Sequence, residues 1–344
     1  MPKSTIRSLL ASPPFLRAWQ ALPGTHLSVF TLHRFAVPDL GVVGHDPGQL
    51  ADTLARLRRE GIPILPLKTI VEALRNHLPL ARRAVVFTVD DGYFDFADVG
   101  APVFEHFDCP VTVFLVSGFL DGTAWLWWDK LRFMLTDPRS RPLLTALLDN
   151  GAPARVPARL SAVVDEICHR CTRLPTSELL ELINYLGLRT GVDMPQAPPE
   201  QFRPMSWDAV NTLARRELVT FGPHSITHPV LPNTSGEHAA QEIDGSWRRL
   251  QEVLQDPLPV FSYPNGGHGM REVDLVRRAG LHAAVATVPR YLTIDGRQPG
   301  DDLVFRLPRF PYADQTQSLL LTAAGFRRLQ RMTLVARPIP AASR

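Results

Sequence analysis

Apolar residues fall into two patterns along the chain: short continuous runs and positions spaced as on one face of a helix. Continuous apolar runs are typical of strands buried on both faces of a parallel sheet. They predict strands at 27–32, 62–65, 84–89, 111–116, 218–221, 260–263 and 283–287. Helical spacing predicts helices at 47–60, 67–78, 96–107, 207–216, 237–254 and 271–279, with Ser206 as an N-cap. Strands that alternate with helices indicate an α/β barrel or a doubly wound sheet.

The spacing changes between about residues 122 and 203, where the pattern is helical and irregular. We interpret this stretch as a helical insertion in a main domain that spans 23–315. Residues 1–22 are predicted to form a short amphipathic arm, and 316–344 a C-terminal helix followed by a proline-rich tail. No internal repeat is visible.

Composition narrows the class of protein. The 344 residues are 45% hydrophobic and 21% charged, and the net charge is +3, so the chain has the composition of a soluble globular protein without the basic surface of a nucleic-acid binder. No apolar stretch approaches the length of a membrane span, and no signal-peptide core follows the first basic residues. We therefore expect a cytoplasmic protein, whose arm could contact an anionic membrane peripherally.

Candidate chemistry gathers where predicted strands end. Asp90 and Asp91 follow one buried strand, and His224 and His228 follow another. Adjacent buried carboxylates repel each other and are costly to desolvate, a cost that a metal ion would relieve. Two imidazoles and one carboxylate make an open metal site with room for water. Taken singly, Asp-Asp-Gly also suits a plain turn, and the histidine spacing can arise by chance.

A third strand end reads Phe261-Ser-Tyr-Pro-Asn-Gly266. With Thr88-Val-Asp-Asp-Gly92 and His224-Ser-Ile-Thr-His228, it makes three ordered motifs. In order and spacing they resemble the motifs of the polysaccharide deacetylase family (the NodB-homology domain, carbohydrate esterase family four), in its bacterial surface-polysaccharide branch. The resemblance covers roughly residues 26–310 apart from the insertion. It implies a distorted (β/α) barrel of about seven strands.

The resemblance also implies roles for single residues. Asp91, His224 and His228 would bind a divalent metal, expected to be zinc, with cobalt or nickel as alternatives. Asp90 would be the general base, and the backbone N–H of Tyr93 would help to bind the oxyanion. Two further residues, Tyr263 and Asn265 of the third motif, are candidates for substrate contact.

Two family features are missing from the sequence. The third motif lacks its usual arginine, which orients the catalytic aspartate, and Ser262 or Asn265 stands near its place. The late Leu-x-His motif that supplies the general acid is replaced by Arg306-Leu-Pro-Arg-Phe-Pro311. We predict His33, at the end of the first strand, as the acid, with Arg34 helping to replace the arginine and His268 as the alternative acid.

The predicted activity is metal-dependent hydrolysis of the N-acetyl group of an acetamido sugar, with a saccharide as the partner. Trp125, Trp127 and Trp128 could stack on sugar rings or simply pack the insertion against the barrel. Cys168 and Cys171 are interpreted as reduced thiols on a helix. Two other functions stay open: hydrolysis of a different amide on the same scaffold, and saccharide binding without turnover.

Overall fold

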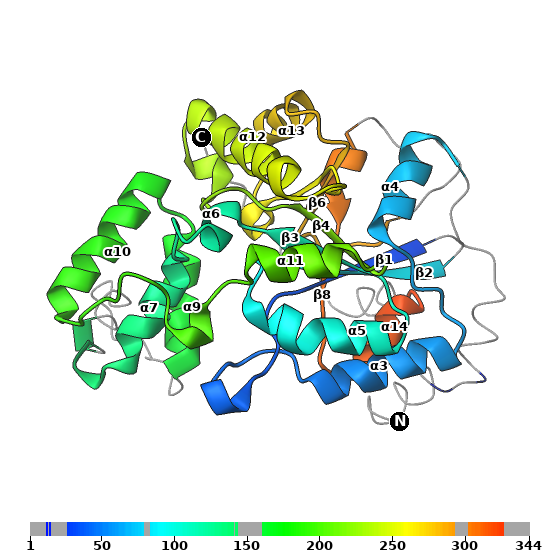
Figure 1. Cartoon of the computed structure of the whole chain (residues 1–344), viewed down its shortest axis with the longest axis horizontal. Helices are drawn as coiled ribbons and strands as arrows, with labels where there is room; N and C mark the ends of the chain where they lie inside the picture. Colours follow the sequence, from blue (N-terminus) through cyan, green and yellow to red (C-terminus); the bar gives the residue numbers. More distant parts are fainter. Residues whose placement is uncertain are drawn as a thin grey trace, which may run out of the picture.

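A five-stranded parallel sheet forms the centre of the protein (Figure 1). The computed structural model describes residues 12, 14, 26–78, 83–140, 142–143, 160–292 and 302–326. The strand order is β4-β3-β2-β1-β8, and every neighbouring pair is parallel. The strands are β1 (His26–Leu32), β2 (Arg83–Val89), β3 (Val111–Leu115), β4 (Val219–Pro223) and β8 (Phe310–Pro311).

A second parallel sheet has the order β5-β6-β7. Its strands are β5 (Val260–Ser262), β6 (Ala283–Ala286) and β7 (Leu307–Pro308). The N–H of Leu258, just before β5, donates to the carbonyl of Phe221 in β4 (2.7 Å), and only Arg309 separates β7 from β8. At one edge, β5 therefore comes next to β4, and at the other edge β7 continues into β8. This is the strand arrangement of a distorted barrel.

Helices cover the outside of the sheets and connect successive strands. Around the sheets lie α3 (Pro47–Arg59), α4 (Leu67–Arg75), α5 (Ala101–His106), α6 (Ser117–Leu120), α11 (Trp207–Ala214), α12 (Gly236–Val253), α13 (Met270–Arg278) and α14 (Thr316–Ala323). A π-helical turn, Phe96–Gly100, precedes α5, and short 3-10 turns occupy Pro38–Leu40, Pro138–Ser140, Glu200–Phe202, Leu231–Asn233, Pro264–Gly266 and Val304–Arg306.

The predicted insertion forms a separate lobe beside the sheets, on the left in Figure 1. It consists of α7 (Trp127–Thr136), α9 (Leu160–Cys171) and α10 (Thr176–Thr190). These helices share a small hydrophobic core of their own, built around Leu131, Met134 and Ile183. The lobe thus has internal packing that is distinct from the main core.

Most predicted elements are confirmed, including the N-cap of α11, where Ser206 Oγ accepts from the N–H of Ala209 (3.1 Å). The strand predicted at 62–65 is wrong: only Ile64 makes an isolated bridge, to Val85. Pro63 and Pro66 flank that bridge, and proline has no N–H to extend a ladder. The segment Leu307–Pro311 was not predicted as a strand, yet it supplies β7 and β8.

The predicted outer segments are described only in part. The arm predicted at 1–22 lies outside the described residues, except for Ser12 and Pro14. In the C-terminal segment, α14 packs into the main core through Leu319, Leu320 and Ala323, and residues 327–344 lie outside the described part. None of the helices in the described ranges combines the length and the apolar character that a membrane crossing requires.

Candidate metal centre and catalytic pocket

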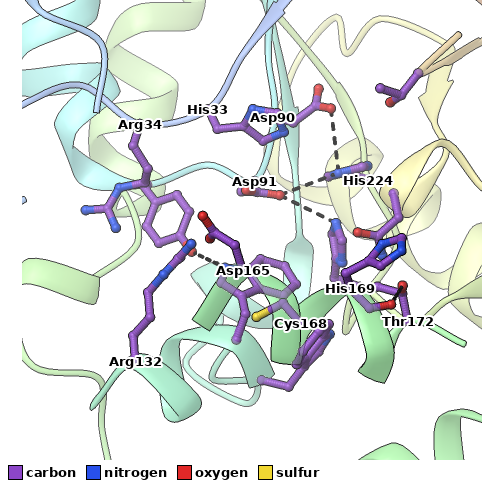
Figure 2. A pocket seen from close by; sticks show the side chains of 16 residues that line it. His33, Arg34, Asp90, Asp91, Arg132, Asp165, Cys168, His169, Thr172 and His224 are labelled. Carbon is purple, nitrogen blue, oxygen red and sulfur yellow. Dashed lines mark hydrogen bonds and ion pairs between the residues drawn. The ribbon is translucent and has the colours of Figure 1, made fainter. Parts of the chain in front are cut away.

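The ends of four parallel strands meet at one pocket of about 510 Å³ (Figure 2). His33 follows β1, Asp90 and Asp91 follow β2, His224 follows β4, and Asn265 lies just beyond β5. All of them line the pocket, together with His228. Because parallel strands bring their carboxyl ends to the same edge, motifs far apart in the chain become neighbours.

Asp91, His224 and His228 form a compact buried group. Asp91 Oδ1 lies 3.6 Å from Nε2 of His224 and 3.6 Å from Nε2 of His228. One ligand atom from each of the three residues lies within 4.8 Å of the others. Within the described ranges no other set of three His, Cys, Asp or Glu residues is this close.

This donor set fits a divalent metal ion. Bonds of about 2.0–2.1 Å place neighbouring ligands of a tetrahedral zinc about 3.4 Å apart, close to the distances from Asp91 Oδ1 to the two imidazoles. Nδ1 of His224 lies 2.7 Å from the carbonyl oxygen of Ser262, so it carries the proton and leaves Nε2 free to bind the ion. The three residues together would supply two nitrogens and one oxygen to an ion, a donor set that leaves room for water.

The charges of these groups agree with that role. Burial, followed by the charge of His224, lowers the pKa of His228 to about 3, so this imidazole is neutral near pH 7. Burial raises the pKa of Asp91, but the hydrogen bond with His224 and the charge of His228 outweigh it, and the net shift is downward. A neutral imidazole and an ionised carboxylate are the forms that bind a metal.

The backbone around the ligands adopts rare conformations. Positive φ angles occur at Asp91 (78°), Ser225 (66°), His228 (58°) and Asn265 (55°). Each such angle on a residue other than glycine costs on the order of 1–3 kcal/mol and persists only where its surroundings fix it. Such strain concentrates at functional sites.

A buried carboxylate holds the strained loop that carries both histidines. Glu242 of α12 accepts hydrogen bonds from the N–H groups of Ile226 and Thr227, each 2.8 Å long, and from Thr227 Oγ1 at 2.6 Å. Ser225 Oγ accepts from the N–H of His228 (3.0 Å). These contacts fix the geometry of the two imidazoles before any ion binds.

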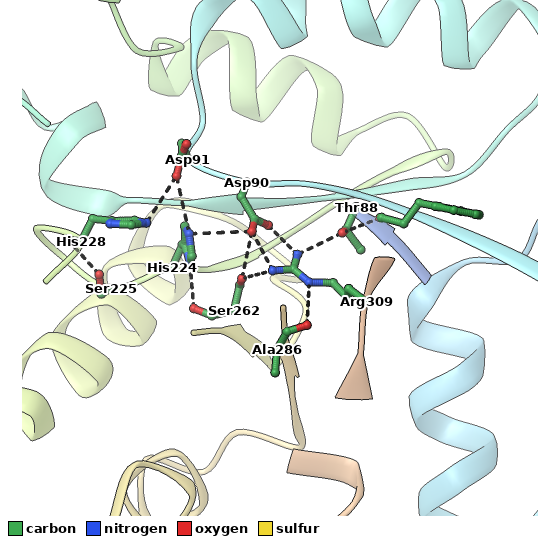
Figure 3. A network of polar contacts seen from close by, with 10 residues as sticks. Thr88, Asp90, Asp91, His224, Ser225, His228, Ser262, Ala286 and Arg309 are labelled. Carbon is green, nitrogen blue, oxygen red and sulfur yellow. Dashed lines mark hydrogen bonds and ion pairs between the residues drawn. The ribbon is translucent and has the colours of Figure 1, made fainter. Parts of the chain in front are cut away.

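Asp90 belongs to a second polar network, next to the group of Asp91, His224 and His228 (Figure 3). Arg309 holds its carboxylate with two parallel bonds, from Nη1 to Oδ1 and from Nη2 to Oδ2, both 2.7 Å. The guanidinium also donates to Thr88 Oγ1 and to Ser262 Oγ, each at 3.0 Å. Burial by itself would raise the pKa of Asp90, but the charge of Arg309 holds it well below its ordinary value.

Arg309, which was not predicted from the sequence, orients Asp90. The prediction that Arg34 helps to replace the missing orienting arginine is therefore wrong. Arg309 is fully buried between β7 and β8, and it occupies the place predicted for an orienting arginine. The guanidinium of Arg34 instead donates to Asp95 Oδ2 and to the carbonyl of Gln201, both at 2.6 Å, and its carbon lies 3.9 Å from the centre of the Tyr93 ring. The signal for Arg309 was a charged residue inside the apolar run Leu307–Pro311.

Two other candidates do not reach the pocket. The Tyr263 hydroxyl is buried and donates to the carbonyl of Phe305 (3.1 Å), and Tyr263 is absent from the residues that line the pocket, so the structure gives no support to its predicted contact with substrate. The ring of His268 stacks on Tyr263 at 4.6 Å, and Nδ1 lies 2.9 Å from the carbonyl of Gly266. His268 is absent from the residues that line the pocket, whereas His33 is exposed there beside Asp90.

The insertion closes the other side of the pocket, which the sequence did not predict. Trp128 of α7 lies with its ring 4.5 Å from that of His228, and its Nε1 donates to the Tyr93 hydroxyl (2.9 Å). That hydroxyl in turn donates to Asp129, a buried carboxylate whose pKa burial raises to about 6. Of the three tryptophans considered, Trp127 and Trp128 line the pocket and Trp125 does not.

Comparison with known proteins agrees with this geometry. The family model described as polysaccharide deacetylase matches residues 178–284, a stretch that contains His224 and His228. Asp90 and Asp91 precede that stretch and reach the same site through the fold. A search of curated proteins finds no match to the chain.

Several solved structures share the fold. The deacetylase PplD of Streptococcus pyogenes is 15% identical, with a TM-score of 0.56 over 88% of this chain and 99% of that one. IcaB from Ammonifex degensii is 16% identical, with a TM-score of 0.57 over 88% and 98%. A de-N-acetylase from Aggregatibacter actinomycetemcomitans is 14% identical, with a TM-score of 0.54 over 86% and 100%.

At these identities the structural likeness shows the fold, and the family model adds the sequence evidence. The resemblance seen in the three motifs is thereby confirmed: residues 178–284 match the family model of the polysaccharide deacetylases, and the fold is shared with solved deacetylases.

Proposed function

We propose that the protein uses a divalent metal ion to hydrolyse the N-acetyl group of an acetamido sugar, in a polysaccharide, an oligosaccharide or a lipid-linked saccharide. Water adds to the amide carbonyl, the carbon–nitrogen bond breaks, and acetate and a free amine leave. The observation that carries the proposal is the buried group of Asp91, His224 and His228 beside the Asp90–Arg309 pair. Zinc is the proposed ion, with cobalt or nickel as alternatives. The cytoplasmic location and the membrane contact stay predictions.

Each residue of the site has one task in this reaction. An ion held by Asp91, His224 and His228 would polarise the amide carbonyl and lower the pKa of water. Asp90, ionised over the neutral range, accepts the proton of the attacking water. The N–H of Tyr93, for which the described residues provide no backbone acceptor, is free to bind the oxyanion. His33 gives a proton to the departing amine.

The experiment is acetate release from acetylated amino-sugar oligosaccharides by metal-stripped protein, with and without added Zn²⁺, Co²⁺ or Ni²⁺. We expect release only after metal addition. Metal-dependent hydrolysis of simpler amides without release from any sugar would favour an amidase of another class. Saccharide binding without any release would favour a non-catalytic relative.

Replacing Asp90 with asparagine should separate metal binding from turnover. The amide has nearly the size of the carboxylate but cannot accept the proton of water. We expect stoichiometric metal and a fall in kcat of about 100- to 10,000-fold, the usual contribution of a general base. Metal analysis and initial rates on the same sample test this, and a near-normal rate would place the base elsewhere.

Replacing His33 with alanine should remove the general acid without disturbing the metal. His33 is exposed at the end of β1, and among the described residues no hydrogen bond or ion pair joins it to Asp91, His224 or His228. The native enzyme should lose rate on the alkaline side of its pH–rate profile, where the departing amine no longer receives a proton from a general acid. We expect the variant to lose most turnover and this alkaline limb. A variant with the native rate and profile would rule His33 out.

A further inference from the structure

We propose that α9 of the helical insertion is the saccharide-recognition wall of this pocket, and that Asp165, His169 and Thr172 bind the hydroxyl groups of the sugar that carries the acetamide. This inference rests on the proposed function and adds to it the residues that select the substrate. Figure 2 shows the three side chains and Arg132 across the pocket from Asp90 and Asp91.

One face of α9 is built for the pocket and another for the core of the lobe. Val164, Ile167 and Cys171 are buried in that core. The pocket face carries Asp165, Cys168 and His169 of α9 and Thr172 directly after it, which fall within an arc of about 100° on a helix with 3.6 residues per turn. Asp165 and His169 are exposed, and all four residues line the cavity that contains the candidate metal ligands, so this face of the helix is open to a molecule that enters the pocket.

The lobe is fixed to both loops that carry the metal-binding residues. On α7, Asp129 and Trp128 both bind the hydroxyl of Tyr93, two residues after Asp91. At the end of α9, the side-chain amide of Asn233 donates to the carbonyls of Thr172 (2.9 Å) and Leu174 (3.0 Å). These hydrogen bonds therefore fix the position of the pocket face of α9 relative to the candidate metal ligands.

The charges on the pocket wall indicate what it binds. The guanidinium groups of Arg34 and Arg132 are paired, with Asp95 at 2.6 Å and with Asp129 at 3.3 Å. The carboxylate of Asp165 has no ion-pair partner among the described residues, although it lines the pocket. On this wall, an unpaired carboxylate beside paired cations favours hydroxyl or amine donors over a phosphate.

The remaining groups suit a sugar. Nε2 of His169 lies 3.0 Å from Nη2 of Arg173, which leaves Nδ1 as the ring nitrogen for a sugar hydroxyl. Thr172 Oγ1 donates to the carbonyl of His169 (2.8 Å) and keeps its lone pairs for an incoming hydroxyl. Burial raises the pKa of the Cys168 thiol to about 12, so it stays neutral and contributes no competing charge. Trp127 and Trp128 add aromatic surface to the same cavity. Aromatic rings with a few convergent polar groups are typical of small-molecule sites.

The test compares recognition of the sugar with the chemistry of deacetylation. Oligosaccharides of N-acetylglucosamine, N-acetylgalactosamine and N-acetylmannosamine are assayed, and the best of them is used for the variants Asp165→Ala, His169→Ala and Thr172→Val. A sugar-free acetyl ester, 4-methylumbelliferyl acetate, reports metal-dependent chemistry in parallel. Glu181→Ala removes a carboxylate from the exposed surface of α10 in the same lobe and is the matched control.

We expect Asp165→Ala to lower kcat/KM for the saccharide about 10- to 100-fold, the usual effect of losing a hydrogen bond to a charged group. Hydrolysis of the ester and metal content should stay within about twofold of the native values, and Glu181→Ala should behave as the native protein. Native saccharide kinetics in all three α9 variants would overturn the inference and leave the proposed function intact. A native enzyme that cleaves the ester but no saccharide would contradict both.

Discussion

Replacing His224 or Asp91 with alanine is expected to abolish metal binding and acetate release together. Each residue supplies one of three protein ligands from a rigid, buried site, and two remaining ligands are too few for a stable open centre. The predicted loss of activity is complete within the limits of the assay. Metal analysis by mass spectrometry and acetate release, both on the same preparation, measure the two effects.

A surface histidine provides the control for that experiment. His106, at the end of α5, is exposed and lies outside the pocket, so His106→Ala should keep both metal and rate. Circular dichroism should show native helix content in every variant. Stoichiometric metal in a folded variant that lacks both His224 and His228 would rule this centre out.

Replacing Arg309 with methionine is expected to reduce both stability and turnover. Removal of one partner from a buried ion pair leaves the other charge uncompensated, at a cost of about 3–5 kcal/mol in the free energy of unfolding. Turnover should fall about 100-fold or more, because Asp90 loses the two bonds that aim it at the attacking water. Urea unfolding and steady-state kinetics measure the two effects separately.

The pH–rate profile distinguishes positioning of Asp90 from simple structural support. Arg309 holds the pKa of Asp90 far below its ordinary value, against the opposing effect of burial. Loss of the guanidinium removes the largest of the effects that oppose burial, so the pKa of Asp90 should rise and the acidic limb of the profile should move to higher pH. Arg309→Lys keeps the positive charge beside Asp90. In this variant the acidic limb should lie closer to its native position than in Arg309→Met.

The neighbouring Arg306 offers a matched control on the same segment, because it is half-buried and does not contact Asp90. Arg306→Met should leave the acidic limb in place. An Arg309→Met protein with reduced stability but the native rate and profile would show that Arg309 supports the fold only.

The grouping of the candidate metal ligands could be anticipated because its determinants are local. Asp91, His224 and His228 each follow an apolar strand, and parallel strands bring their carboxyl ends together. The strand pattern and the three motifs were therefore sufficient to predict which of these residues lie side by side. Their conformations were not predictable, since the positive φ angles depend on contacts such as those made by Glu242.

Arg309 could not be assigned from the sequence, because its partner lies 219 positions away and its strands are only two residues long. Prolines at 308 and 311 also conceal the strand pattern there. The misplacement of Arg34 has the same origin: proximity to His33 in the sequence suggested Asp90 as its partner, whereas the fold offers Asp95. The position of α9 at the pocket depends on how the helical insertion packs against the sheets. The periodicity of apolar residues within one helix does not determine that packing.

The most direct test of the account is a titration of metal-stripped protein with Zn²⁺ while acetate release from an acetamido-sugar oligosaccharide is followed. If Asp91, His224 and His228 form one catalytic metal centre, the rate should rise from near zero in proportion to bound zinc and reach a plateau at one equivalent. Full acetate release by metal-free protein, or a rate that does not follow occupancy of this site, would contradict it.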